Sequence, residues 1–304
     1  MKQLIRHFWC LAIFITGACN STDRATTTAP ESDFALPYAL DAPDVVKDLP
    51  ASLREISGLS LAPNGRQLVT VNDEQGVLYF LNPETGAIES KQVFGKPNDY
   101  EGIATIDSTV YVVSSKGTIY QVKSDTQTVH YPTPLNGSFD VEGLCYDAIQ
   151  NRLLIACKGR AGKGDRFLHK KAIYAFDLNK MKLRDEPAYL IDRNEIARWK
   201  GGSGTLFARI NEFLSTDQAP SAFGPSGLAV CPIDGNLYIV ASVGKALAVV
   251  RPDGSLAWVQ RLPASRFQQP EGICFDAQGR LYISSEGKNG IPGRIFRFAN
   301  TKSE

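Results

Sequence analysis

The sequence predicts an all-β protein folded as a five-bladed β-propeller, and a repeated phrase with a regular spacing leads to this fold class. A short phrase built on Glu-Gly or Ser-Gly returns five times, and its glycines are 44, 41, 84 and 45 residues apart. A period of roughly 40–45 residues made of short strands is typical of propeller blades. The glycines of the five copies are Gly58, Gly102, Gly143, Gly227 and Gly272.

Each copy begins the same strand–turn–strand course, which is the second observation behind the fold class. In the last copy, residues 271–275 form an apolar strand, residues 276–279 a turn, and residues 280–284 a second strand. The corresponding turns of the other copies are expected at residues 63–65, 107–108, 148–151 and 233–236. Third and fourth strands follow by alternation of apolar and polar residues, so each copy predicts one four-stranded blade.

The last blade ends at residues 294–298 without a fourth strand, and residues 38–46 precede the first blade. An N-terminal strand from this segment would close the ring and remove its open sheet edges. The interval of 84 residues also allows a sixth blade. Only about 30 residues remain there once the third blade is complete, which is short for four strands and their turns. We therefore expect five blades within residues 37–300, with loop insertions at 159–171 and 193–224, and six blades as the alternative.

The N-terminus is a targeting segment. Lys2 and Arg6 precede an apolar stretch at residues 8–15, which is too short for a permanent membrane span. The small residues before Cys19 resemble the lipobox of bacterial lipoproteins, which predicts a signal peptide at residues 1–19 and a lipid on Cys19. An ordinary cleaved signal peptide is the alternative. Residues 20–36 read as a flexible tether, so we expect a protein exported and lipid-anchored to the bacterial cell envelope, on the periplasmic or outer-membrane face.

The amino-acid composition limits the classes of partner that the protein is expected to bind. Lys and Arg number 33 against 32 Asp and Glu, and a net charge of +1 gives no global field for nucleic acid. We expect a monomer whose membrane contact is the N-terminal lipid and whose partner is an unknown ligand or envelope protein. The four cysteines that follow Cys19 lie in apolar stretches of predicted strands. This location favours an interpretation as small buried hydrophobic residues over one as disulfides. The four cysteines are Cys145, Cys157, Cys231 and Cys274.

The repeated phrase gathers polar residues at one mouth of the central channel, because the start of strand one and the end of strand two lie at the same end of a hairpin. Strand one opens at Glu55, Glu101, Glu142, Ser226 and Glu271. Strand two closes at Asn72, Asp73, Ser115, Lys158 and Glu286. Both long insertions connect at this mouth, which is where we place function.

Carboxylates pressed around a narrow axis repel one another. Some must therefore be protonated, or pair with Lys158, or hold a cation. Calcium is the natural cation, because it takes several oxygen ligands. Histidine is scarce, which argues against zinc and against a Ser-His-Asp triad. In the structural alternative, each glutamate bonds a neighbouring blade and only sets the blade spacing. The glycine-rich basic segment at residues 158–166 is either a solvated loop or a lid for an anionic ligand.

The phrases around Gly58, Gly102, Gly143 and Gly272, with the closing segment at residues 281–286, resemble the SdiA-regulated propeller family. The resemblance covers about residues 50–299. It implies a five-bladed, membrane-associated or exported propeller with a calcium site and no established biochemical activity. It favours Glu101, Glu142 and Glu271 as calcium ligands, with Glu55 and Glu286 second. This chain departs from the family at Gly224, where an acid often stands, so one ligand is absent.

Two functions and one non-functional alternative follow. The first is an envelope module that binds calcium and a ligand or protein partner at the channel mouth, with Asn72, Asp73, Ser115, Lys158 and Ser226 in contact. The second is a calcium-dependent hydrolase of the lactonase, esterase or phosphoesterase kind, in which Asp73 or Glu286 is the base. A purely structural propeller is the third reading and predicts no response to calcium.

Overall fold

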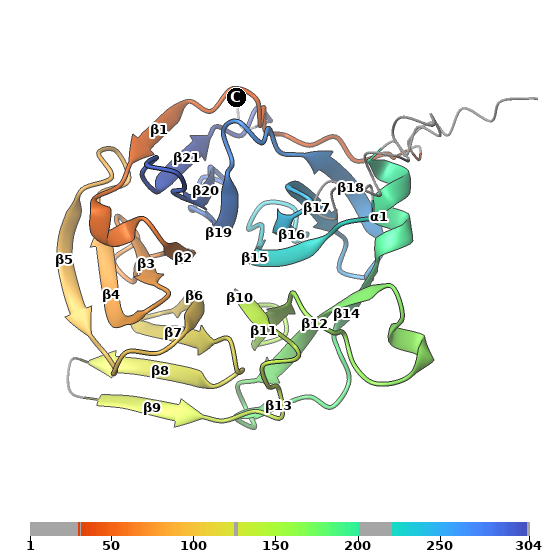
Figure 1. The fold of residues 1–304 in the computed structure, drawn as a ribbon, viewed down its shortest axis with the longest axis horizontal. Coiled ribbons are helices and arrows are strands. Elements are labelled where there is room, and N and C mark those ends of the chain that lie inside the picture. The colour runs from red at the N-terminus through yellow and green to blue at the C-terminus, as the bar shows by residue number, and fades with distance from the viewer. Residues whose placement is uncertain (1–29, 31, 125–126, 201–220, 303–304) are drawn as a thin grey trace, which may run out of the picture.

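The computed structural model describes residues 30, 32–124, 127–200 and 221–302, and these residues form five sheets around a common axis (Figure 1). Four of the sheets are built from consecutive antiparallel strands, and the fifth takes its outer strand from the N-terminal side. The predicted five-bladed β-propeller is confirmed. We number the blades one to five in the order of the repeated phrase.

The strands of blades one and two follow the phrases closely. Blade one contains β2 (Ile56–Leu61), β3 (Leu68–Asn72), β4 (Gln75–Leu81) and β5 (Ile88–Val93). Blade two contains β6 (Tyr100–Ile106), β7 (Thr109–Ser114), β8 (Ile119–Ser124) and β9 (Gln127–Tyr131). In both blades the innermost strand is the one that carries the phrase.

Blades three to five repeat this order. Blade three contains β10 (Val141–Asp147), β11 (Arg152–Cys157) and β12 (Lys170–Asp177), with β13 (Lys182–Leu183) and β14 (Tyr189–Asp192) sharing its outer edge. Blade four contains β15 (Gly224–Val230), β16 (Leu237–Val243), β17 (Ala246–Val250) and β18 (Leu256–Arg261). Blade five contains β19 (Gln269–Phe275), β20 (Leu281–Glu286), β21 (Arg294–Phe298) and β1 (Val45–Asp48).

The turn between the first two strands of every blade contains one residue in the left-handed region, which lets the chain reverse tightly. All five lie in the turns predicted from the sequence: Gly65, Asp107, Asn151, Gly235 and Gly279. These turns lie at the end of the axis opposite to the start of strand one.

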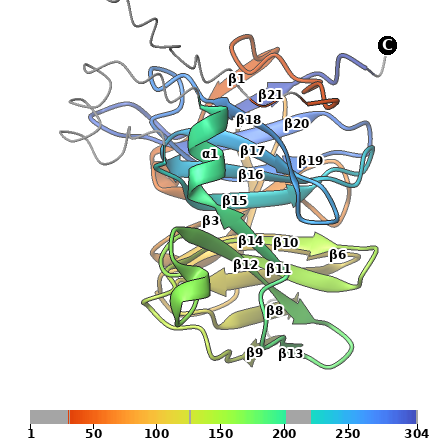
Figure 2. The same ribbon diagram turned by 90° about the vertical axis from the view of Figure 1, so that its right-hand side faces the viewer.

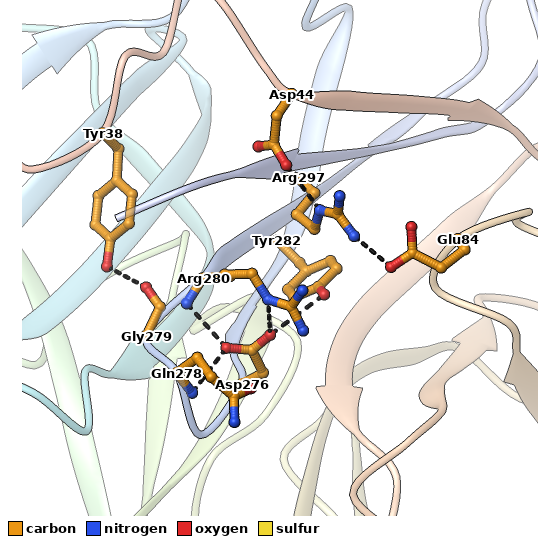
Figure 3. A network of polar contacts seen from close by, with 9 residues as sticks. All are labelled: Tyr38, Asp44, Glu84, Asp276, Gln278, Gly279, Arg280, Tyr282 and Arg297. Carbon is orange, nitrogen blue, oxygen red and sulfur yellow. Dashed lines mark hydrogen bonds and ion pairs between the residues drawn. The ribbon is translucent and has the colours of Figure 1, made fainter. Parts of the chain in front are cut away.

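An N-terminal strand closes the ring, as predicted, although it begins later than residues 38–46 suggested. β1 pairs antiparallel with β21, with Val45 opposite Arg297. Tyr38 packs instead into the core between blades four and five, and its hydroxyl donates to the Gly279 carbonyl at 2.7 Å. Arg297 locks the junction between blades five and one, because its guanidinium binds both Asp44 and Glu84 (Figure 3).

The turn of blade five is held by a single buried carboxylate (Figure 3). The oxygens of Asp276 accept from the backbone N–H of Gln278 and Arg280, and from Arg280 Nε at 2.5 Å. The carboxylate is buried while the Arg280 side chain remains 41% exposed, and these contacts fix the turn that follows β19. The charge of Asp276 is therefore already compensated within its own hairpin.

The glycines of the phrase explain how five inner strands fit around one axis. A Cβ at position 227 would lie 2.2 Å from the Glu271 carbonyl oxygen, and one at position 272 would lie 2.6 Å from the Gly58 carbonyl carbon. Such distances leave no room for a side chain. Gly58, Gly102 and Gly143 approach the next blade in the same way, so we call the five residues the glycine ring. Blade three touches blade four directly, so the six-blade alternative is wrong.

Apolar clusters fill the spaces between neighbouring blades. One cluster joins blades three and four and includes Ile196 and Trp199 of helix α1 (Arg193–Trp199). Figure 2 shows α1 on the outer side of the ring, in front of blade four. Asp192 accepts a hydrogen bond from the Asn194 N–H and caps this helix. A single helical turn, Asp165–Phe167, lies in the other predicted insertion, and another, Ala51–Leu53, precedes blade one.

The four cysteines within the described residues are buried and unpaired, as the sequence favoured. Burial raises the pKa of the Cys157 thiol to about 12. The thiols of the two cysteines on either side of blade four, Cys145 and Cys274, are also held neutral by burial. They serve as small apolar groups within the inner strands.

The chain makes its first contacts with the ring before the predicted boundary at residue 37. Ser32 Oγ donates to the Ala257 carbonyl at 2.7 Å, and Phe34 and Leu36 pack against the core of blades four and five. The end of the predicted tether therefore belongs to the propeller, because its apolar side chains find a buried surface. The predicted signal peptide, Cys19 and residues 201–220 lie outside the described residues. Within the part described, neither helices nor helical turns are long and apolar enough to cross a membrane.

Candidate functional site

The register of the inner hairpins places the predicted polar residues at one end of the axis. Ile56 lies opposite Asn72, Tyr100 opposite Ser114, and Gln269 opposite Glu286. The start of strand one and the end of strand two therefore share one mouth in each blade. We call this end the acidic mouth. It contains Glu55, Asp73, Asp99, Glu101, Asp140, Glu142, Lys158, Glu271 and Glu286.

A β-bulge at every copy of the phrase determines the direction in which the glutamate side chains point. In blade two, Tyr100 pairs with Ser114 and Gly102 pairs with Val113, so Glu101 has no partner in the ladder. Glu142 is left out in the same way between Val141 and Gly143. Bulges interrupt the alternation of side chains and redirect the extra residue. The repeated bulge is the local reason why carboxylates from different blades come close together.

Two of these carboxyl groups are deeply buried and a third, Glu101, is partly buried; Glu142 interacts with both of the others. Glu271 is 3% exposed and Glu142 is 6% exposed. Burial, followed by the charge of Glu142, raises the pKa of Glu101 to about 10. Burial raises the pKa of Glu142 to about 7, although Lys158 opposes the shift. Burial and the charges of Glu142 and Glu286 hold the pKa of Glu271 well above its ordinary value. The structure therefore places the three predicted principal ligands at one mouth, within electrostatic range of Glu142.

A second group of acids surrounds them. Burial, and then the charges of Asp73 and Glu55, raise the pKa of Glu286 to about 7. Burial, and then the charge of Glu55, raise the pKa of Asp73 to about 6. Glu55 itself is exposed at the rim. Glu286 and Asp73 thus titrate near neutral pH beside the buried group, which is the range useful for proton transfer.

Lys158 is the one ammonium in direct contact with these carboxylates among the described residues. Its Nζ lies 2.8 Å from Glu142 Oε1. Burial works against its charge, but Glu142 and then Glu271 raise the pKa of Lys158 above its ordinary value. A Cβ at position 224 would lie 3.2 Å from the Lys158 Cγ. Gly224 therefore leaves space for the lysine stem.

Two buried carboxylate oxygens have no hydrogen-bond partner among the described residues: Glu271 Oε2 and Asp73 Oδ1. Buried oxygens of this kind are costly unless a proton or a cation satisfies them. Carboxylates from several blades are also the donors that calcium prefers. However, within the described residues no three His, Cys, Asp or Glu side chains are grouped closely enough to hold a metal ion as they stand. The donor chemistry fits calcium, and the side chains would have to close around it.

Three predicted contact residues are committed to the fold. Ser226 Oγ donates to the Pro270 carbonyl at 2.6 Å, which joins blades four and five. Asn72 Nδ2 donates to the Glu55 carbonyl at 3.3 Å, and its Oδ1 accepts from the Glu74 N–H. The backbone of Ser115 links neighbouring strands in blades two and three. These residues support the mouth, and a ligand would find their polar groups largely engaged.

The structural alternative for the glutamates is visible in one place. Ser57 Oγ donates to Glu101 Oε2 at 3.0 Å and also reaches the Glu101 carbonyl. Glu101 therefore helps to set the distance between blades one and two. The Glu101 carboxyl group also shares a side-chain hydrogen bond with Asp99 of the acidic mouth, so it belongs to the blade contact and to the mouth together.

Sequence reasoning missed two acids of this mouth as site residues. The charge of Asp99 helps to raise the pKa values of Glu101 and Glu142. The charge of Asp140 also helps to raise the pKa of Glu142. Both stand three residues before the glycine of their phrase, as Glu55 does. That spacing is the signal that would have found them, because the same offset in each repeat places a side chain at the same height.

A hollow at the other end of the axis was also missed. Its volume is about 460 Å³, and all five blades line it. The glycine ring separates it from the acidic mouth, and the void beside the ring encloses no space for a water molecule. The axis is therefore closed in the middle, and the propeller has two separate mouths.

Comparisons with known proteins support the fold alone. No family model matches the chain, and no curated protein matches it. A glutaminyl cyclase of Myxococcus xanthus is 14% identical, with 85% of this chain and 95% of that chain covered and a TM-score of 0.54. A luciferin-regenerating enzyme is 11% identical over the same shares, with a TM-score of 0.51. A putative gluconolactonase is 12% identical, with 82% and 77% covered and a TM-score of 0.48. The chain is a β-propeller protein.

Proposed function

We propose that this protein is an exported, lipid-anchored propeller of the SdiA-regulated kind that binds calcium and a ligand or protein partner at the acidic mouth. One observation carries the proposal. Buried or partly buried carboxylates from blades two and five both interact with Glu142 of blade three, and two buried acid oxygens lack partners among the described residues. A divalent cation would relieve both the repulsion and the unmet hydrogen-bonding capacity.

In this proposal Glu101, Glu142 and Glu271 hold the cation, with Glu55 and Glu286 at the rim. Protons leave the carboxyl groups when the cation binds, because their raised pKa values keep part of them neutral at pH 7. Lys158 withdraws from Glu142. The surplus of acids at the rim would then attract a positively charged ligand or protein surface.

The anchor is the remaining part of the proposal. A lipid on Cys19 would hold the propeller at the cell envelope, and the segment before Ser32 would set its distance from the membrane. β1 pairs with β21 and completes blade five from this chain's own N-terminal side, so this blade needs no strand from a second copy. We therefore propose a monomer whose membrane contact is the N-terminal lipid.

Calcium titration followed by calorimetry tests the proposal. The purified protein should bind one calcium ion at pH 8, and the melting temperature should rise with calcium concentration. Magnesium should bind more weakly, because it demands a stricter octahedral geometry. Glu142→Gln should abolish most of the heat, whereas the matched change Glu186→Gln, at an exposed ion pair, should not. A protein that shows no heat and no change in melting temperature would reject calcium binding.

One observation favours a second candidate, the calcium-dependent hydrolase of the lactonase, esterase or phosphoesterase kind. The pKa of Asp73 is about 6 and that of Glu286 is about 7, so either carboxylate is suited to act as a general base at neutral pH. The hydrolase predicts turnover of lactone, ester or phosphate substrates that requires calcium. Asp73→Asn should abolish turnover and leave calcium binding largely intact. Calcium binding without any turnover would favour the binding module.

A further inference from the structure

The hollow opposite the acidic mouth has the features of a built cavity. Five aliphatic side chains line it at the axis, one from each blade: Leu59, Ile103, Leu144, Leu228 and Ile273. Each is at most 3% exposed. Every one directly follows the glycine of the repeated phrase. The same repeat that forms the acidic mouth therefore also forms this lining. We call the hollow, with this lining and its walls, the apolar cavity.

The walls of the apolar cavity are formed by small and aromatic side chains. Ala104, Ala229 and the two cysteines Cys145 and Cys274 follow the aliphatic residues in their strands, and Tyr146 and Phe275 lie beyond them. Small residues keep the cavity open, and sulfur and aromatic groups are polarizable surfaces for an apolar guest. The glycine ring closes the bottom, so a guest cannot extend toward the acidic mouth.

The charge of the lining restricts the guest. The charged side chains among the described residues that line the cavity are Asp107 and Asp276, and no lysine, arginine or histidine is among them. Asp276 is paired with Arg280 in its own turn. Asp107 is exposed at the rim. The hydroxyls of Ser60 and Thr105 also line the cavity and are hydrogen-bonded to each other. An anionic guest would be repelled by the rim and would lose its hydration without a cationic partner in the cavity.

We propose that the apolar cavity is a binding site for a compact, uncharged apolar molecule, such as a single ring system or a short alkyl chain. Its volume of about 460 Å³ lies within the range of small-molecule sites, roughly 300–1,000 Å³. Contributions from five blades make the cavity rigid, because each wall is part of an inner strand. This site is independent of the function proposed for the acidic mouth.

A pair of fluorescent probes that share one ring skeleton tests the proposal. N-phenyl-1-naphthylamine is uncharged, and 1-anilinonaphthalene-8-sulfonate adds a sulfonate to the same skeleton. The uncharged probe should bind the purified protein with one-to-one stoichiometry and a micromolar dissociation constant. The anionic probe should bind at least about tenfold more weakly, because its charge has no partner in the cavity. Equal binding of both probes, or no binding of the uncharged probe, would overturn the proposal.

Cysteine labelling locates the bound probe. Cys145 and Cys274 line the apolar cavity, whereas Cys157 and Cys231 are buried elsewhere in the blades. Saturating N-phenyl-1-naphthylamine should slow alkylation of Cys145 and Cys274 by N-phenylmaleimide several-fold, as read by peptide mass spectrometry. Alkylation of Cys157 and Cys231 should keep its rate. Binding that protects all four cysteines equally, or none, would place the probe outside the cavity and overturn the proposal.

A matched pair of variants completes the test. Thr105→Trp places a large side chain at the wall of the cavity and should weaken the uncharged probe about tenfold or more. Leu168→Trp places the same side chain on an exposed loop and should leave binding unchanged. Circular dichroism and thermal melting verify that both variants fold. A folded Thr105→Trp protein with unchanged binding would overturn the proposal, as would a dimer that forms through this mouth and excludes the probe.

Discussion

The two mouths of this propeller are made by the same four-residue phrase and yet have opposite chemistry. In Glu142-Gly143-Leu144, the glutamate belongs to the acidic mouth, the glycine to the ring between the mouths, and the leucine to the apolar cavity. Successive residues of one strand thus supply a charged surface, a spacer and an apolar surface. One repeat can therefore encode two separate sites, because the close-packed glycine ring lies between them.

The mouths also differ in how they respond to protons. Burial and mutual repulsion raise the pKa values of the acids at one mouth, whereas the lining of the other mouth holds only Asp107 and the paired Asp276 as charged groups. Changes in pH or in calcium should therefore act on the acidic mouth and leave the apolar cavity unaffected. Each experiment below either separates the two mouths or disturbs both.

The largest effect is expected from the layer that both mouths share. In Gly227→Ala the new Cβ would lie 2.2 Å from the backbone oxygen of Glu271, and the strands of blades four and five would have to move apart. The free energy of unfolding should fall by about 3 kcal/mol, and binding at both mouths should weaken together. Gly137→Ala is the control, because nothing lies within 4 Å of a Cβ there. A stable Gly227→Ala protein would contradict the role assigned to the glycine ring.

The fold was largely predictable because the phrase depends on backbone packing. Each glycine is required by the approach of the next blade, so its spacing reports the blade period directly. The closing strand was predicted in kind but displaced, because Tyr38 is apolar enough to resemble a strand residue and packs into the core instead. The turns were placed correctly because each needs a residue with positive φ, and Gly, Asn and Asp adopt it most readily.

The site was less predictable, because its side-chain contacts form between blades that are far apart in the sequence. The convergence of Glu101, Glu142 and Glu271 followed from symmetry. The insertion of Lys158 into the space left by Gly224 did not, because it depends on the path of one side chain. The apolar cavity escaped notice since its aliphatic residues look like ordinary core in the sequence. Only the closed ring shows that the five of them surround an open space.

The next largest effect is expected from the removal of one carboxyl group at the acidic mouth, which should affect only that mouth. Burial and the neighbouring carboxylates raise the pKa of Glu271 well above its ordinary value. The amide in Glu271→Gln imitates the neutral form that this environment favours, so the melting temperature without calcium should change little. The affinity for calcium should fall about tenfold or more, because one ligand is lost. Binding of N-phenyl-1-naphthylamine should be unchanged. A loss of probe binding in this variant would show that the two mouths are not independent.

A smaller effect is expected from pH alone. Glu142 and Glu286 have pKa values of about 7 in the folded protein, above the ordinary value of about 4.3 for glutamate in an unfolded chain. The folded state therefore binds more protons than the unfolded state. The stability that these two groups contribute is fully present below about pH 4 and is lost as pH rises through about 7. The melting temperature should fall by several degrees between pH 5 and pH 8. Saturating calcium should reduce this fall, whereas N-phenyl-1-naphthylamine should bind equally at both pH values.

The smallest effect is expected from the lysine that competes for the acidic mouth. Lys158→Met keeps an apolar stem beside Gly224 but removes the ammonium that contacts Glu142. Calcium would no longer have to displace a like charge, so its affinity at pH 8 should increase by about threefold. Lys163→Met, at an exposed position, controls for the loss of one positive charge.

The direction of the change in Lys158→Met is decisive. An increase in affinity would show that the lysine occupies the place of a cation and that its ammonium weakens calcium binding. A decrease would show that the ammonium holds Glu142 in its binding position. In that case the acidic mouth would be a prearranged ion-pair network, and its contrast with the apolar cavity would rest on burial rather than on cation binding.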